Sequence, residues 1–327
     1  MFKSFLSKLA SEIEDYKSET NDNDETIGIL GIDSLLGHHI AQIILKAKKS
    51  AEFSWFKDQV NIVGFSLASN LSDERSPYLK EIKLKKLSIS PLKEILAPIT
   101  RLIVVPSVWS QKIDSDIFDS LSDAIGSSTK CKQVLLLTSS LSSLPVNGMC
   151  KKLKSLEQDL SKLATTNLVQ IVRIHGLVIS DLTPFLRRKP YPMSEDETKL
   201  FVPFSKDQRL SLICCEDVAD FVLRVFFQSK DCVFGLQSEE ISGFSYNCYK
   251  CLREYLKGNV TLVETRMSHY EKEMSAKDQN FIIVCKLIAE ESPIVAPKDN
   301  FAGVEKFMKV TNRRPILFEE WLTHKLN

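Results

Sequence analysis

A glycine-punctuated stretch near the amino terminus constrains the fold of this chain more than any other feature. From Ile27 the sequence reads I-G-I-L-G-I-D-S-L-L-G. Its apolar run is too short for a helix and ends at Gly31, which is typical of a buried strand. Strand, glycine turn and helix together open a dinucleotide-binding unit, in which the helix N-terminus attracts a pyrophosphate. The helix is predicted because apolar residues then recur at helical spacing, at Leu36, Ile40, Ile43, Ile44 and Ala47.

The glycine pattern of this turn is incomplete. A Gly-x-x-Gly-x-x-Gly spacing would place glycine at three positions, and this chain has Gly31, Ser34 and Gly37 there. Ser34 puts a side chain where the backbone usually approaches the pyrophosphate. Asp33 adds a negative charge beside the same place. We therefore expect NAD or NADP to bind weakly or not at all.

The rest of the chain alternates between predicted strands and helices, which favours an α/β fold with a doubly wound, Rossmann-like parallel sheet of five to seven strands. We divide it into an N-terminal helix and acidic linker (1–26), a Rossmann-like core (27–180) and a small C-terminal α/β lobe for a substrate or partner (181–327), interleaved with the core. The predicted strands after the first are 60–65, 82–89, 101–105, 133–137, 169–174 and 232–236. The predicted helices include 113–125, 149–165, 244–257 and 269–289.

Residues at the ends of the predicted strands are the other candidates for cofactor binding, because ligands of such sheets lie at the carboxyl ends of the strands. Ser66 follows the second strand, where an acid would favour NAD and an arginine NADP. Neither is present, so no preference is predicted. Pro106 and Ser107 follow the strand expected beside the glycine turn.

Composition limits the class of protein. Lys+Arg number 43 and Asp+Glu 42, so a general nucleic-acid binder, which needs a basic surface, is not expected. No apolar run approaches the ~18 residues of a transmembrane helix. Eight cysteines are scattered, mostly in apolar runs, which favours a reducing compartment. We expect a cytoplasmic protein, with mitochondrial or nuclear location as alternatives; the acids Glu12, Glu14 and Asp15 are unusual for a mitochondrial presequence.

Several motifs along the chain resemble the NmrA-like branch of the atypical short-chain dehydrogenase/reductases. They are the glycine turn, Q-V-L-L-L-T-S-S from Gln133, I-V-R-I-H-G from Ile171, C-E-D-V-A-D-F from Cys215 and T-N-R-R-P-I-L-F-E-E-W-L from Thr311. The resemblance covers 27–322 and implies a dinucleotide-binding sheet with a small C-terminal lobe. Some members of that family are NADPH-dependent reductases. Others bind dinucleotide without turnover and regulate partner proteins.

The catalytic pair of the wider superfamily is a Tyr and a Lys four residues apart on one helix face. The predicted helix 149–165 contains no tyrosine. Lys152 or Lys154 could stand at the position of the family lysine, but solvated lysines are the simpler interpretation. Ser139 is a further weak candidate, because it follows a strand that ends at the expected ligand site.

Other polar and sulfur-containing side chains are candidates for binding a ligand or a metal ion. His175 follows a predicted strand, so it is kept as a candidate ligand contact. The basic run 187–189 could meet a phosphate or an acidic partner, or be solvated. No metal site is expected: the single C-x-x-C at Cys248 and Cys251 has no second pair at zinc-binding spacing. These thiols, like Cys214 and Cys215, are interpreted as buried.

Together these observations favour a non-catalytic or weakly catalytic NmrA-like protein that acts as a binding or regulatory module. One alternative is an NAD(P)H-dependent reductase of a small carbonyl or quinone-like substrate. Another is an accessory subunit of a larger complex. The partner is then either another protein or a small molecule held at the carboxyl edge of the sheet.

Overall fold

The computed structural model describes most of the predicted core and part of the C-terminal lobe. The described residues are 25–49, 60–66, 80–83, 89–106, 115–139, 148–179, 191–192, 198–202, 206–207, 209–228, 234–247, 249–250, 253, 260–264 and 300–321. Several predictions concern residues outside these ranges. They are the N-terminal helix, Ser107, the basic run 187–189, Cys248, Cys251 and the helix 269–289.

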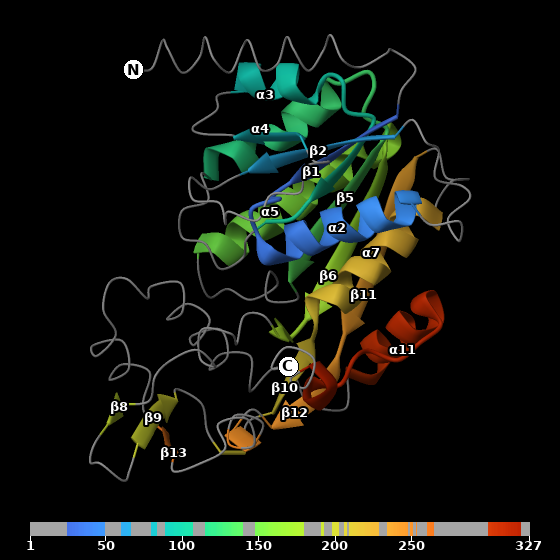
Figure 1. Ribbon diagram of the computed structural model, residues 1–327. Coiled ribbons are helices and arrows are strands. Elements are labelled where there is room, and N and C mark those ends of the chain that lie inside the picture. The colour runs from blue at the N-terminus through green and yellow to red at the C-terminus, as the bar shows by residue number, and fades with distance from the viewer. Residues whose placement is uncertain are drawn as a thin grey trace.

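A seven-stranded sheet forms the centre of the molecule, with strand order β11-β6-β5-β4-β1-β2-β3 (Figure 1). Every neighbouring pair in it is parallel, which confirms the predicted parallel sheet of five to seven strands. The first six strands in sequence have the order of a Rossmann fold. The strands are β1 (Thr26–Leu30), β2 (Asn61–Ser66), β3 (Lys80–Lys83), β4 (Arg101–Val104), β5 (Gln133–Ser139), β6 (Leu168–His175) and β11 (Gly235–Ser242).

Helices cover both faces of this sheet (Figure 1). One face carries α2 (Leu35–Lys49), α7 (Cys215–Gln228) and α11 (Asn300–Thr311). The other face carries α3 (Ile89–Leu96), α4 (Ser115–Gly126) and α5 (Gly148–Lys162). A short 3₁₀ turn, η3 (Leu163–Thr165), follows α5. Three-layer burial explains why the central strands are apolar almost throughout instead of alternating.

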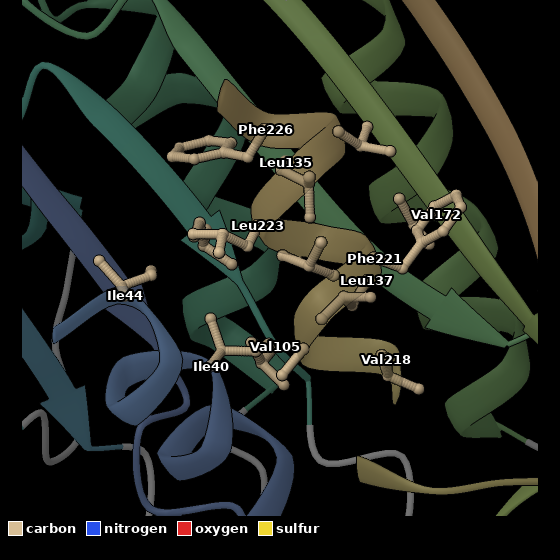
Figure 2. Packing of buried hydrophobic residues seen from close by; sticks show 14 of the residues in the cluster. Ile40, Ile44, Val105, Leu135, Leu137, Val172, Val218, Phe221, Leu223 and Phe226 are labelled. Atoms are coloured by element: carbon tan, nitrogen blue, oxygen red, sulfur yellow. The ribbon is translucent and has the colours of Figure 1, made fainter. Parts of the chain in front are cut away.

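The core consists of one apolar cluster on each face of the sheet. Successive residues of β5 alternate between them: Leu135 and Leu137 face α2 and α7, whereas Val134 and Leu136 face α3, α4 and α5. In Figure 2, side chains of α2 and α7 point onto the same strands. Because α2 begins at the glycine turn, its packing on α7 fixes the position of that turn. Besides Leu135 and Leu137, the residues labelled in this layer are Ile40, Ile44, Val105, Val172, Val218, Phe221, Leu223 and Phe226.

The carboxyl end of α7 is held by side chains from the amino ends of the strands. Arg101 donates from Nη2 to the carbonyl of Phe226 at 2.6 Å, and Gln133 donates to the same oxygen at 2.7 Å. Gln170 donates to the carbonyl of Val225 at 3.0 Å. The last carbonyls of a helix have no partner within it, so these donors satisfy them. This interaction positions α7, and through it α2.

Two small three-stranded sheets complete the described structure. One has the order β12-β10-β7 and lies at the carboxyl edge of the main sheet (Figure 1); the other has the order β13-β9-β8. They contain β7 (Leu177–Val178), β10 (Arg209–Ile213) and β12 (Phe244–Asn247), and β8 (Tyr191–Pro192), β9 (Thr198–Val202) and β13 (Val260–Glu264). The division of the chain into a core and a C-terminal lobe stays a prediction, since β7 lies within the predicted core range and pairs with β10 of the predicted lobe.

Three predicted elements were wrong in type or extent. Of the strand predicted over 82–89, the structure describes only the start, which belongs to β3 (Lys80–Lys83). Ile89 already begins α3, because Pro91 is tolerated within a first helical turn. The short strand predicted over 232–236 is instead β11, which runs to Ser242. The helix predicted from Phe244 begins as a strand, since Phe244–Asn247 pairs antiparallel with β10. Long-range pairing outweighed the local pattern there.

Candidate functional site

The glycine turn lies between the ends of β2 and β4, where the strand order reverses. The amide of Gly31 donates to the carbonyl of Phe65 at 2.8 Å, and the amide of Val105 donates to the carbonyl of Leu30 at 2.8 Å. Gly31 has a φ of 88°, and a Cβ there would lie 2.0 Å from the carbonyl oxygen of Val105. Only glycine fits this position, as the sequence predicted.

The hydroxyl of Ser34 is used entirely within the turn. Its Oγ donates to the carbonyl of Gly31 at 2.7 Å and accepts from the amide of Gly37 at 2.9 Å. Ser34 is therefore the N-cap of α2 and satisfies one of the donors at the start of the helix. A Cβ on Gly37 would lie 2.2 Å from the Gly31 carbonyl oxygen, so the third glycine is needed for this close packing.

Two donors remain for an anion at this helix start. Within the described residues, the amides of Leu35 and Leu36 have no hydrogen-bond partner. Both lie at the positive end of the helix dipole. The Ser34 proton is directed at Gly31, so the hydroxyl can offer an incoming phosphate only a lone pair. The turn keeps the geometry of an anion site. It has fewer free amide donors than it would have with glycine at position 34, because Ser34 Oγ already accepts from the Gly37 amide.

The other predicted contacts gather at the same edge of the sheet. Ser66 ends β2, Pro106 directly follows β4 and Ser139 ends β5. Strands β5, β4, β1 and β2 are consecutive neighbours, so these residues and the glycine turn share the carboxyl edge. Pro106 and Ser139 are buried. The structure thus groups the described cofactor candidates.

The lysine candidates lie on α5, whose buried face consists mainly of leucines. Leu153, Leu156 and Leu160 face the core, while Lys154 is exposed. The side chain of Lys152 lies outside the described part of the structure. Next to these lysines, the described residue on the buried face of α5 is therefore Leu153, whose side chain cannot donate a proton.

His38 lies on α2, which begins at the glycine turn. Its Nε2 is 2.8 Å from Nε2 of Gln42, one turn further along the same helix.

Polar residues that the sequence analysis missed lie at the ends of β5 and β6. Thr138 is 2% exposed, and its hydroxyl has no hydrogen-bond partner among the described residues. Its neighbour across the ladder is Arg173, which binds Glu157 of α5 at 2.7 Å. The motif I-V-R-I-H-G contained Arg173, but only the fold reveals its partner.

His175, kept as a candidate ligand contact, is engaged with the neighbouring strand. Its Nε2 lies 3.0 Å from Oε2 of Glu240 on β11. Both side chains are partly exposed. The contact holds the end of β6 to the edge strand and does not direct the imidazole at the glycine turn.

The described cysteines are buried thiols, which confirms the interpretation of Cys214 and Cys215 as core residues. Burial raises the pKa of the Cys214 thiol, and the charge of Asp217 raises it further. Burial also raises the pKa of Cys131 to about 12. Protonated thiols are poor nucleophiles and metal ligands. Among the described residues, no cluster of His, Cys, Asp or Glu could hold a metal ion.

Comparison with solved structures finds the same fold in proteins with several different functions. A nucleoside-diphosphate-sugar epimerase from Staphylococcus aureus aligns with a TM-score of 0.65 at 15% identity, over 91% of this chain and 99% of that one. An NADPH-dependent quinone oxidoreductase from Escherichia coli, complexed with NADPH, aligns with a TM-score of 0.64 at 12% identity, over 92% and 100%.

A third solved structure is NmrA, a negative transcriptional regulator, in complex with NAD. It aligns with a TM-score of 0.63 at 11% identity, over 91% of this chain and 94% of that one. The chain shares the Rossmann-like fold of these three proteins. The Rossmann-like fold expected from the resemblance is thus confirmed, with low sequence identity to each of these proteins.

Comparison of the amino-acid sequence alone finds no relatives. No family profile matches the chain, and no curated protein matches it. Among the described helices, none is long and apolar enough to cross a membrane.

Proposed function

We propose that this chain is a non-catalytic or weakly catalytic NmrA-like module that binds a dinucleotide weakly and acts through a partner. The observation that carries the proposal is the self-capped turn: Ser34 Oγ accepts from the Gly37 amide and donates to the Gly31 carbonyl. The lack of a tyrosine on α5 supports the loss of superfamily chemistry. A regulator and an oxidoreductase both occur among the proteins with this fold.

Two energetic terms oppose a pyrophosphate at the turn. An N-cap interaction stabilises a helix by about 1 kcal/mol, and a phosphate that takes the Gly37 amide must displace it. A unit charge ~5 Å from Asp33 would be repelled by about 3 kcal/mol at an effective dielectric of ~20, less where solvent screens it. The free amides of Leu35 and Leu36 and the helix dipole act in the opposite direction. We therefore propose weakened rather than abolished binding.

A second function, an NAD(P)H-dependent reductase, is favoured by the intact backbone of the turn. Gly31 and Gly37 approach neighbouring carbonyls so closely that neither position has room for a Cβ. A reductase of a small carbonyl or quinone-like substrate would then transfer hydride without a tyrosine as proton donor. This alternative predicts tight binding of NADPH or NADH to the unaltered protein.

Calorimetric titration of NADPH and NADH into wild type and three variants tests the proposal. Ser34→Gly removes both Cβ and hydroxyl, Ser34→Ala removes the hydroxyl alone, and Asp33→Thr with Ser34→Gly also removes the charge. We expect weak wild-type binding and a gain of about tenfold or more in the double variant. A gain in affinity in Ser34→Ala would show that the hydroxyl's capping hydrogen bonds weaken binding. A gain seen in Ser34→Gly but not in Ser34→Ala would show that the volume of the side chain weakens it. Ser155→Ala, at an exposed serine of α5, is the control.

Other outcomes would select the alternatives. Low-micromolar binding by wild type with no gain in any variant would favour the reductase. Absence of binding in every variant, with folding verified by circular dichroism, would favour an accessory subunit that keeps the fold for its surface.

A further inference from the structure

Each strand of the small sheet β12-β10-β7 continues directly from, or into, an element of the main layer. Only Gly176 separates β6 from β7, only Cys214 separates β10 from α7, and only Gly243 separates β11 from β12. These three junctions lie together, because a Cβ on Gly176 or Gly243 would meet the backbone of Ser211 or Leu212 in β10. The small sheet is therefore joined to the core along a single bend.

The C-terminal segment 312–321 crosses this bend; we call it the strap. It starts where α11 ends, at Asn312, whose φ of 57° is the left-handed conformation of a helix C-cap. Its first contact is with α7: Arg313 binds Asp217 through Nη1 at 2.5 Å and Asp220 through Nη2 at 3.0 Å. The amide of Ile316 donates to the other oxygen of Asp217 at 2.8 Å.

The far end of the strap is attached to the small sheet. The amide of Phe318 donates to the hydroxyl of Tyr246 in β12 at 3.1 Å, and the two rings lie 5.9 Å apart. Phe318 is 1% exposed, and its ring stacks on that of Trp321. One end of the strap thus holds α7 and the other holds β12, on opposite sides of the bend.

We propose that the strap braces this bend, so that its release lets the small sheet open as one unit while the seven-stranded sheet stays folded. The junctions are single residues at element ends, the kind of position at which hinge motions occur. The core sheet has two apolar clusters of its own, and neither contains a residue of the strap. Among the described residues, β7 and β10 contribute to them only Val178 and Ile213, which lie beside the bend. Local opening of such units is expected wherever a few contacts hold a peripheral element.

Amide hydrogen exchange of the full chain, measured by mass spectrometry, tests whether the strap braces the bend. Arg313→Met removes the contact to both carboxylates and leaves Asp217, which is fully buried, without its cation. Arg314→Met is the matched control, because Arg314 is the next residue and its ion pair among the described residues is with Glu320, which is exposed and belongs to the strap itself. We expect Arg313→Met to speed exchange about tenfold or more in the strap, β10 and β12, with β1, β4 and β5 unchanged.

Two results would overturn the proposal. One is faster exchange throughout the chain, which would make the strap part of the global folding unit. The other is faster exchange in the strap alone, which would mean that it does not brace β12. If Arg313→Met does not fold, Asp220→Asn provides the test. It removes one of the two carboxylates that Arg313 contacts and keeps the other, Asp217. A smaller rise confined to the strap, β10 and β12 supports the proposal; a uniform rise, or no rise, refutes it.

Discussion

Arg313 and Asp217 form an ion pair between two motifs that lie far apart in the sequence. Nη1 of Arg313 is 2.5 Å from Oδ1 of Asp217, which has no exposed surface. Burial alone would lower the pKa of the Arg313 guanidinium, but its hydrogen bonds to Asp217 and Asp220 and their charges outweigh burial and raise that pKa. The motifs C-E-D-V-A-D-F and T-N-R-R-P therefore form one structural feature, in which a buried carboxylate requires the C-terminal segment.

Replacing Arg313 should lower the free energy of unfolding more than replacing Asp217. Arg313→Met leaves a buried carboxylate without its cation and should lower the free energy of unfolding by about 3 kcal/mol or more. Asp217→Asn leaves a partly exposed guanidinium that solvent can reach, so its cost should be smaller, about 1–2 kcal/mol. Urea unfolding followed by circular dichroism measures both. Equal losses would show that the burial of Asp217 is unimportant.

Gly31 should tolerate no side chain. Gly31→Ala places a Cβ against the Val105 carbonyl at 2.0 Å and also strains a positive φ, so we expect a loss of more than about 4 kcal/mol or no soluble protein. Gly235→Ala is the control, because its φ of 136° is positive but its Cβ would meet nothing within 4 Å. Backbone strain alone should cost about 1–2 kcal/mol there. Similar losses in the two variants would contradict the close approach.

The contacts of Arg101 should not be replaceable by lysine. Its guanidinium reaches Glu25 at 2.8 Å, Gln133 at 2.6 Å and the Phe226 carbonyl, and it lies over the Phe226 ring. One ammonium group cannot match this planar set of donors, so Arg101→Lys should lose about 2–3 kcal/mol of stability. Lys162→Met, which breaks an exposed pair with Asp159, should change stability by less than about 1 kcal/mol. Thermal unfolding compares the two.

Cys131 should weaken the folded state as the pH becomes alkaline. Burial raises its pKa from 9.0 to about 12, so the unfolded chain loses this proton at a lower pH than the folded one. The neutral thiol contributes its full stability below pH 9, and that contribution falls as the pH rises toward 12. Cys131→Ala should therefore show a shallower loss of stability between about pH 9 and 10.5 than wild type. Parallel slopes would indicate that the thiol ionises freely.

Thr138 should be replaceable by valine without loss of stability. Its hydroxyl is buried and has no partner in the part of the chain that the structure describes, so it carries a desolvation cost that no hydrogen bond there offsets. Thr138→Val keeps the branched shape and should leave the free energy of unfolding unchanged or raise it by about 1 kcal/mol. A marked loss would mean that the hydroxyl bonds a water molecule or ligand at the carboxyl edge.

The amino-acid sequence alone determined the features that depend on local pattern. Gly31 and the apolar runs around it predicted the first strand, the turn and the helix, because strand and helix periodicities and a positive φ leave clear marks on sequence. The apolar strands between amphipathic helices predicted a parallel sheet. The group of Ser34, Ser66, Pro106 and Ser139 at one edge followed from that fold, since parallel strands end on the same side.

Tertiary structure alone decided what depends on partners far apart in the chain. Phe244–Asn247 forms a strand because it pairs antiparallel with β10, and the local sequence pattern of these residues did not predict that pairing. The pairs Arg313–Asp217 and Arg173–Glu157 require two elements to fold together before their charges meet. The sequence also placed Ser34 correctly but could not show that its hydroxyl caps its own helix. That depends on where the Gly31 carbonyl and the Gly37 amide point after the turn has closed.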